Sequence, residues 1–242
     1  MSMTAKQHHG ATRSVGGGAP GRPTHHLNDE LLLDYAAGAC DEAVSVLVAS
    51  HLTLCPDCRA RADHLDAVGG EMMAALKPQS MADDALERLM KRLDEPAAPA
   101  EPAAVAPPAN ANESAVLPRV LQRYVGPHAD QIAWKPLGLG VDHFELPLDG
   151  DGASRAVMLR VPPGRAVPQH THEGNEYVLV LQGGFSDQCG HFGRGDVESA
   201  DSSVDHRPVA DPGEACICLA VLDGPMRLTS VIGRALNHFI KF

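Results

Sequence analysis

Residues 164–183 read GRAVPQHTHEGNEYVLVLQG, and this stretch decides the fold of the C-terminal half of the chain. Its apolar run EYVLVLQ ends at a glycine, which is typical of a strand that leads into a turn. His170 and His172 share one face of a strand because side chains alternate with a period of two, and Glu176 follows after a short loop. Similar runs, separated by Gly, Pro and Asp turns, are AVMLRV (156–161), ACICLAVL (215–222) and MRLTSVIG (226–233). The pattern predicts an antiparallel β-barrel or sandwich.

The N-terminal half has helical periodicity instead. Asn28 can cap a first helix that stops near Gly38, and further helices are expected from about Asp41, from Pro56 to Pro78, and over about 81–93. The last of these carries an apolar stripe formed by Ala85, Leu86, Leu89, Met90 and Leu93. Such a stripe either completes a helical bundle or is offered to a partner.

The composition divides the chain into four segments. Residues 1–24 contain almost no large apolar side chains, so we expect a disordered tail. Residues 95–118 are rich in Pro and Ala, and their closely spaced prolines favour a semi-extended linker. The linker separates a helical segment at 25–94 from a strand-rich segment at 119–242. The sequence thus predicts an α+β protein with two domains.

Charge and hydropathy restrict the partners of the chain. The formal net charge of −11 argues against direct nucleic-acid binding, which requires a basic face. We find no apolar run of the roughly 18 residues that cross a membrane, and the start of the sequence lacks the apolar core of a signal peptide. We therefore expect a cytoplasmic protein with no membrane partner. In a reducing cytosol, its six cysteines favour metal binding or redox chemistry over structural disulfides.

The stretch HLTLCPDC (51–58) predicts a metal site in the helical segment. His51 and Cys55 are one helical turn apart, Cys58 follows a turn later, and these donors suit tetrahedral Zn(II). The best candidate for the fourth ligand is His26, just before the first helix, although His25 remains possible. A thioredoxin-like redox pair, or cysteines buried as small apolar residues, would leave His51 without a role. A zinc ion here would also stabilise the small helical unit.

Two segments, HHLNDELLLDYAAG (25–38) and VASHLTLCPDCRARA (48–62), resemble the zinc-binding anti-sigma domain of ChrR-type proteins. That family carries a His and a His-x3-Cys-x2-Cys motif in a short helical bundle. The resemblance implies that His26, His51, Cys55 and Cys58 bind zinc. It also implies that the helices cover the polymerase-binding surfaces of an extracytoplasmic-function sigma factor.

The strand-rich segment resembles a cupin barrel. Residues 164–183 fit the first cupin motif, and GDVESADSSVDH (195–206) fits the spacing of the second, although Asp201 and Ser203 replace its usual Pro and Gly. The resemblance implies that four side chains converge on one metal ion inside the barrel: His170, His172, Glu176 and His206. These ligands suit Zn(II), Fe(II), Mn(II) or Ni(II), and the family favours zinc. The alternative is an exposed HTHE loop without a metal.

A helical zinc-binding bundle followed by an all-β cupin barrel is the domain order of ChrR-type anti-sigma factors. The resemblance implies a regulator, not an enzyme, with no catalytic residue and no organic cofactor. It would inhibit its sigma factor and release it when the cupin domain senses singlet oxygen or an organic hydroperoxide. The alternatives are a metal-dependent cupin enzyme, such as a dioxygenase or isomerase, and a zinc-dependent module for another protein partner.

Overall fold

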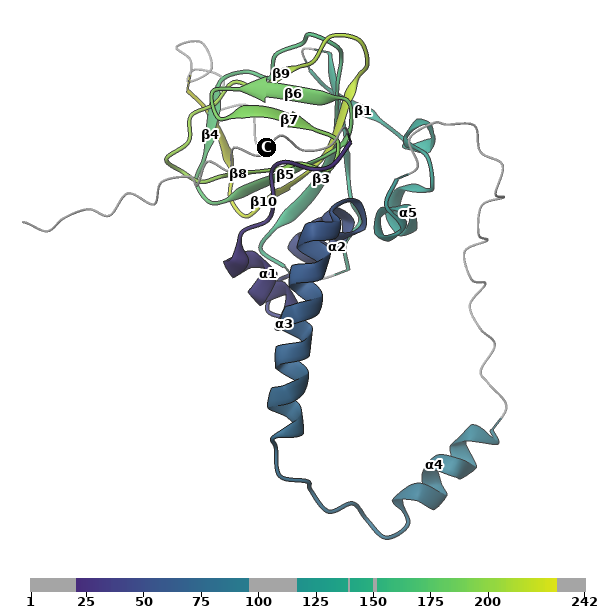
Figure 1. Cartoon of the computed structure of the whole chain (residues 1–242). Coiled ribbons are helices and arrows are strands. Elements are labelled where there is room, and N and C mark those ends of the chain that lie inside the picture. Colours follow the sequence, from purple (N-terminus) through teal and green to yellow (C-terminus); the bar gives the residue numbers. More distant parts are fainter. Residues whose placement is uncertain (1–20, 96–116, 139, 150–151, 230–242) are drawn as a thin grey trace, which may run out of the picture.

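The computed structural model describes residues 21–95, 117–138, 140–149 and 152–229 (Figure 1). Most of the predicted tail (1–24) and of the predicted linker (95–118) lies outside the described residues. Residues 21–24 of that tail have defined positions: Arg22 pairs with Asp57, and Thr24 bonds to Asp196. Within the described part of the chain, no helix combines the length and the hydropathy needed to cross a bilayer.

Three helices form the N-terminal bundle, and each begins where the sequence predicts. Helix α1 (Asp29–Ala36) is capped by Asn28, and α2 (Glu42–Leu54) by Asp41; each side chain accepts a hydrogen bond from a backbone N–H in the first turn. Helix α3 (Pro56–Ala74) begins with a proline, which lacks the N–H that would be unpaired at this position. The sequence predicts these helix starts correctly because a capping side chain bonds to the backbone within one helical turn.

The C-terminal half begins with α5 (Arg119–Val125) and a short 3-10 helix, η1 (Ala129–Gln131). The strands that follow are β1 (Lys135–Gly138), β2 (Val141–Glu145), β3 (Arg155–Val161), β4 (His170–His172), β5 (Glu176–Gln182), β6 (Gly184–Asp187), β7 (Gly190–Gly193), β8 (Val197–Ala200), β9 (Val209–Ala210), β10 (Cys216–Leu222) and β11 (Met226–Leu228). They pair antiparallel in three sheets of order β1-β2-β3-β10-β5-β8, β7-β6-β9 and β11-β4.

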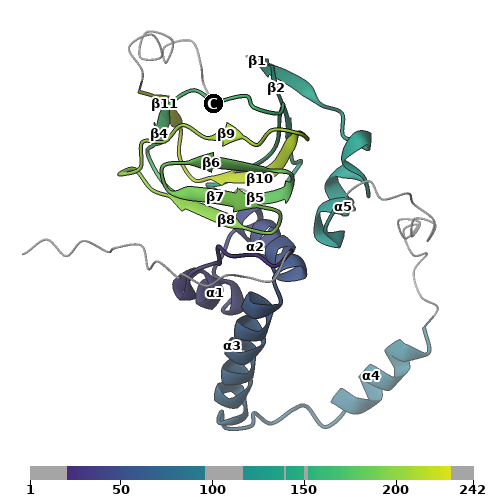
Figure 2. The same cartoon turned by 45° about the horizontal axis from the view of Figure 1, so that its top comes forward.

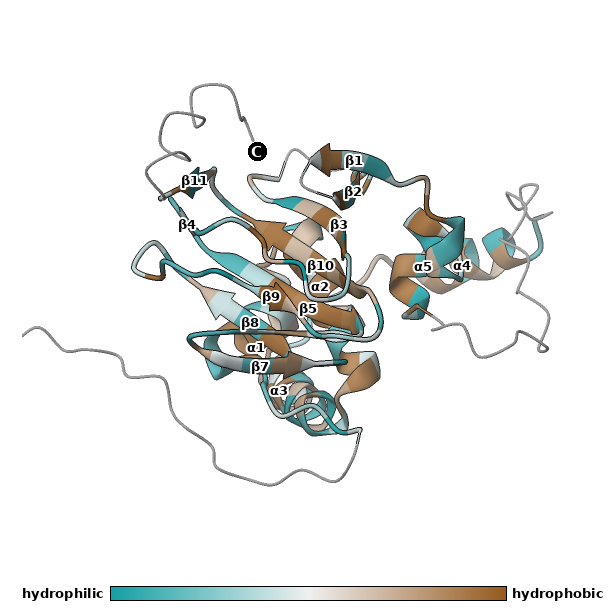
Figure 3. Cartoon of the chain, turned by 90° about the horizontal axis from the view of Figure 1, so that it is seen from above, coloured by the Kyte–Doolittle hydropathy of each residue, from teal (hydrophilic) through white to brown (hydrophobic). Residues whose placement is uncertain are grey.

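The helical bundle packs on the outer face of the large sheet (Figure 2). All seven residues of β10 are buried, because alternate side chains face two different cores. Cys216 and Cys218 face the interior of the strand-rich domain, whereas Ile217 and Leu219 join the core that includes Leu47 of α2. Hydrophobic residues fill most of β5 and β10 in Figure 3, as expected for strands covered on both sides.

Helix α4 (Ala85–Leu93) does not join the bundle. It lies away from α1, α2 and α3 in Figures 1 and 2, and none of its residues is buried. Of the two roles that the apolar stripe left open, completion of the bundle is therefore excluded.

Candidate functional site

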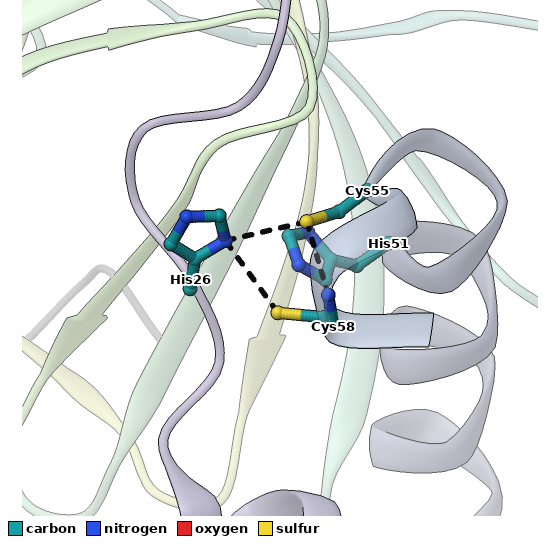
Figure 4. A group of neighbouring side chains, drawn as sticks. All are labelled: His26, His51, Cys55 and Cys58. Carbon is teal, nitrogen blue, oxygen red and sulfur yellow. Dashed lines mark hydrogen bonds between the residues drawn. The ribbon is translucent and has the colours of Figure 1, made fainter. Parts of the chain in front are cut away.

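The first group of potential metal ligands lies where α2 meets α3 (Figure 4). His51 projects from the last turn of α2, Cys55 joins the two helices, and Cys58 lies in the first turn of α3. His26 comes from the segment before α1, and its Nδ1 lies 3.2 Å from Cys55 Sγ and 3.5 Å from Cys58 Sγ. One potential ligand atom from each of the four residues lies within 4.8 Å of the others.

The hydrogen bond of His51 fixes how its ring faces this group. Its Nδ1–H donates to the carbonyl oxygen of Gly195, at 2.9 Å, because a carbonyl can only accept. The other nitrogen, Nε2, is buried and has no hydrogen-bond partner among the described residues. Burial lowers the pKa of His51 to about 4, so the ring is neutral at physiological pH. A buried lone pair beside two thiols and a second imidazole is a donor set that fits tetrahedral Zn(II).

The Cys58 thiol keeps its proton when no metal is bound. Burial, followed by the neighbouring Cys55, raises the pKa of the Cys58 thiol to about 11. Arg61 lies near the same sulfur, with Nη1 3.7 Å from Cys58 Sγ, and also pairs with Asp29. The alternative ligand, His25, faces away: its ring packs against that of Phe192 at a tilt of 41°, with centroids 4.3 Å apart.

The second group lies inside the strand-rich domain and is fully buried. His170 and His172 come from β4, Glu176 begins β5, and His206 is joined to His170 by an isolated β-bridge. Nε2 of His206 lies 3.0 Å from Nε2 of His170 and 3.4 Å from Glu176 Oε2. Nε2 of His172 lies 2.9 Å from the same carboxylate oxygen.

The facing nitrogens of His170 and His206 require a proton or a metal cation between them, because two bare lone pairs would repel each other. The Nδ1–H of His170 donates to the carbonyl of Pro168 at 2.7 Å, which leaves Nε2 with a bare lone pair. Burial alone would lower the pKa of His206, but hydrogen bonds to Asp187, Glu176 and Glu198 outweigh it and raise the pKa to about 12. The same carboxylates that favour a proton on His206 also favour a metal cation, so the donor set fits a metal.

Asp187 and Glu198 are additions to the residues that the sequence singled out. Nδ1 of His206 lies 3.2 Å from a carboxylate oxygen of each. Both side chains are buried, with relative exposures of 0% and 3%. The available signal for Glu198 was strand alternation in VESA (197–200), which places its carboxylate on the same face as the apolar Ala200.

Comparison with known proteins identifies the family. Residues 122–226 match the model of the ChrR Cupin-like domain. The anti-sigma-E factor ChrR of Cereibacter sphaeroides is 42% identical over 223 residues, which cover 90% of this chain and 98% of that protein. The chain belongs to the ChrR family of anti-sigma factors. The resemblance and the two-domain fold class predicted from the sequence are thereby confirmed.

A solved structure of the ChrR family has the same fold. The chain matches a chain of the crystal structure of Rhodobacter sphaeroides SigE in complex with the anti-sigma ChrR, with 43% identity and a TM-score of 0.69. The match covers 82% of this chain and 98% of the other. Membership of the ChrR family supports a regulator rather than an enzyme.

Proposed function

We propose that this chain binds and inhibits an extracytoplasmic-function sigma factor through its helical domain. The similarity to ChrR, whose solved structure is a complex with SigE, supports this role. We propose further that the cupin metal centre senses singlet oxygen or an organic hydroperoxide and that the sigma factor is then released. Because a sigma factor acts on RNA polymerase, the chain would work in the cytoplasm.

The observation that carries the proposal is a set of exposed apolar side chains on α3, on α4 and on the segment between them, called here the α3–α4 surface. Its large hydrophobic side chains are each 47–79% exposed and comprise Val68, Met72, Met73, Leu76, Met81, Leu86, Leu89, Met90 and Leu93. On α4 they recur at spacings of three and four residues, so they form one face of the helix. An amphipathic helix whose apolar side chains are exposed is suited to a groove on a protein partner.

The two proposed metal sites have different roles: the helical site supports sigma-factor binding, and the cupin site senses the oxidant. We propose that His26, His51, Cys55 and Cys58 hold a structural Zn(II). These ligands would tie the segment before α1 to the junction of α2 and α3, from which the α3–α4 surface projects. We propose Zn(II) also for the cupin ligands His170, His172, Glu176 and His206, a donor set that also suits Fe(II), Mn(II) or Ni(II).

The test is binding of the full chain to each resident sigma factor, with metal content measured in parallel. Cys55→Ala/Cys58→Ala should lose zinc from the helical site and lose sigma-factor binding. His170→Ala/His172→Ala should keep binding but hold the sigma factor after exposure to an oxidant that releases it from the wild type. Failure of the metal-replete wild type to bind any resident sigma factor would overturn the proposal. An oxidant that alters the cupin metal yet leaves the complex intact would overturn the sensing step.

A further inference from the structure

The two metal-ligand groups are joined by four consecutive residues, Gly195–Glu198, at the start of β8. At one end, the Gly195 carbonyl accepts the hydrogen bond of His51. At the other end, Glu198 Oε1 lies 3.2 Å from Nδ1 of His206. In each case the group on the segment contacts the ring nitrogen opposite the one that faces the other ligands. Such partners fix the tautomer and orientation of a ligand histidine.

The middle of the segment holds the backbone next to a third ligand. Oδ1 of Asp196 accepts hydrogen bonds from the N–H groups of Thr24 and His25, at 2.5 and 2.9 Å. The N–H of Val197 donates to the His25 carbonyl, at 3.2 Å. The N–H and the carbonyl of His25 are therefore both hydrogen-bonded to this segment. His26 is the next residue along the chain.

The other edge of the segment is fixed to the cupin sheet. The N–H of Gly195 donates to Val180 of β5 at 2.8 Å, and the N–H of Val180 donates to the Asp196 carbonyl at 3.0 Å. Gly195 has a φ of +91°, and a Cβ at this position would lie 2.7 Å from Cγ of Pro23. Only glycine fits so close to the N-terminal segment, so the contact leaves little freedom for one side to move without the other.

We propose that Gly195–Glu198 couples the two metal centres, with Asp196 and Glu198 as positioning residues, so that occupancy of one centre changes the metal affinity of the other. The inference rests on the proposed metal occupancy of both centres. A metal ion held by Nε2 of His206 would fix the position of that ring, whose opposite nitrogen, Nδ1, lies 3.2 Å from Glu198 Oε1. Without the metal the ring would be held less firmly, so Glu198 and, three residues away, the Gly195 carbonyl that orients His51 would lose part of their positional restraint.

The experiment is a zinc titration of the full chain against a chromophoric chelator. His170→Ala/His172→Ala leaves only the helical centre, and Cys55→Ala/Cys58→Ala leaves only the cupin centre. We expect the helical centre to bind zinc about fivefold or more tightly when the cupin centre is loaded than when it is ablated. Because coupling between two occupied sites is reciprocal, zinc affinity at the cupin centre should fall by a similar factor when the helical centre is ablated.

A variant of the connecting segment gives the second arm. The coupling factor is the ratio of the zinc affinities of one centre with the other centre loaded and ablated. Asp196→Ala keeps every proposed ligand but removes the carboxylate that accepts the backbone N–H groups of Thr24 and His25. It should therefore reduce the coupling factor to within about twofold of one. The matched control is Asp142→Ala, which breaks an ion pair with Arg160 on β2 and β3 and should leave the factor unchanged.

The outcomes separate this inference from the proposed function. If the wild-type chain binds two zinc ions tightly but with independent affinities, the coupling is overturned and the proposed metal occupancy stands. An unchanged coupling factor in a folded Asp196→Ala variant would overturn the role of Asp196 and of the segment. A centre that binds no zinc in the wild-type chain would overturn both the coupling and the metal part of the proposed function, whereas sigma-factor binding is measured independently.

Discussion

Replacing Leu86 and Leu89 of α4 with alanine should weaken sigma-factor binding without affecting the fold. The two side chains are 67% and 54% exposed. Complete burial of a leucine side chain contributes about 1.5–3 kcal/mol. If a partner covers the exposed part of both, the contribution is about 2–4 kcal/mol, and its loss raises the Kd about 30- to 700-fold. None of the residues of α4 is buried, so the free energy of unfolding should change by less than about 0.5 kcal/mol.

The assay is titration calorimetry of the full chain with its sigma factor, alongside urea unfolding. Leu137→Ala is the matched control, since this leucine is 40% exposed but lies on β1, away from the α3–α4 surface. It should leave the Kd within about twofold of the wild-type value. The reasoning is refuted if the α4 variant binds as tightly as the wild type, or if the control weakens binding equally.

Three further predictions concern the metal centres and the segment that joins them. Zinc affinity at the helical centre should rise with pH, because zinc displaces the proton of the Cys58 thiol, whose pKa is raised to about 11. The rise from Cys58 alone should be about tenfold per pH unit between pH 6 and 8. A zinc Kd that does not change with pH would contradict this. Glu198→Gln should weaken metal binding at the cupin centre about 10- to 100-fold, as measured by chelator competition, and wild-type affinity would exclude its orienting role. Gly195→Ala should lower the free energy of unfolding by about 1–3 kcal/mol, because the backbone there is left-handed and a Cβ would clash with Pro23. The control is Gly164→Ala, at a left-handed position with open space around it, which should lower the free energy of unfolding in urea by about 1 kcal/mol. Equal losses at both positions would show that the contact of Gly195 with Pro23 is unimportant.

The sequence by itself determined the features that depend on local geometry. Asn28 and Asp41 cap helices because each bonds to a backbone N–H three residues away. The spacing of His51, Cys55 and Cys58 brings three donors together because they flank a single helix junction. The order of the two domains and their resemblance to ChrR-type proteins were also readable, because these motifs are contiguous in the chain.

Only the tertiary structure decided the contacts between distant segments. It selected His26 over His25 as the neighbour of the thiols, because Asp196 and Phe192 hold His25 against the strand-rich domain. It left the stripe of α4 uncovered, although an amphipathic pattern is equally consistent with a buried helix.

The tertiary structure also placed Gly195 and Glu198 beside ligands of two different centres. Gly195 and His51 are 144 positions apart in the sequence. No helical or strand periodicity extends that far, so their contact follows from the way the bundle packs on the large sheet. Burial of a shared core drives that packing, and its geometry depends on all the side chains that fill the core rather than on a local motif.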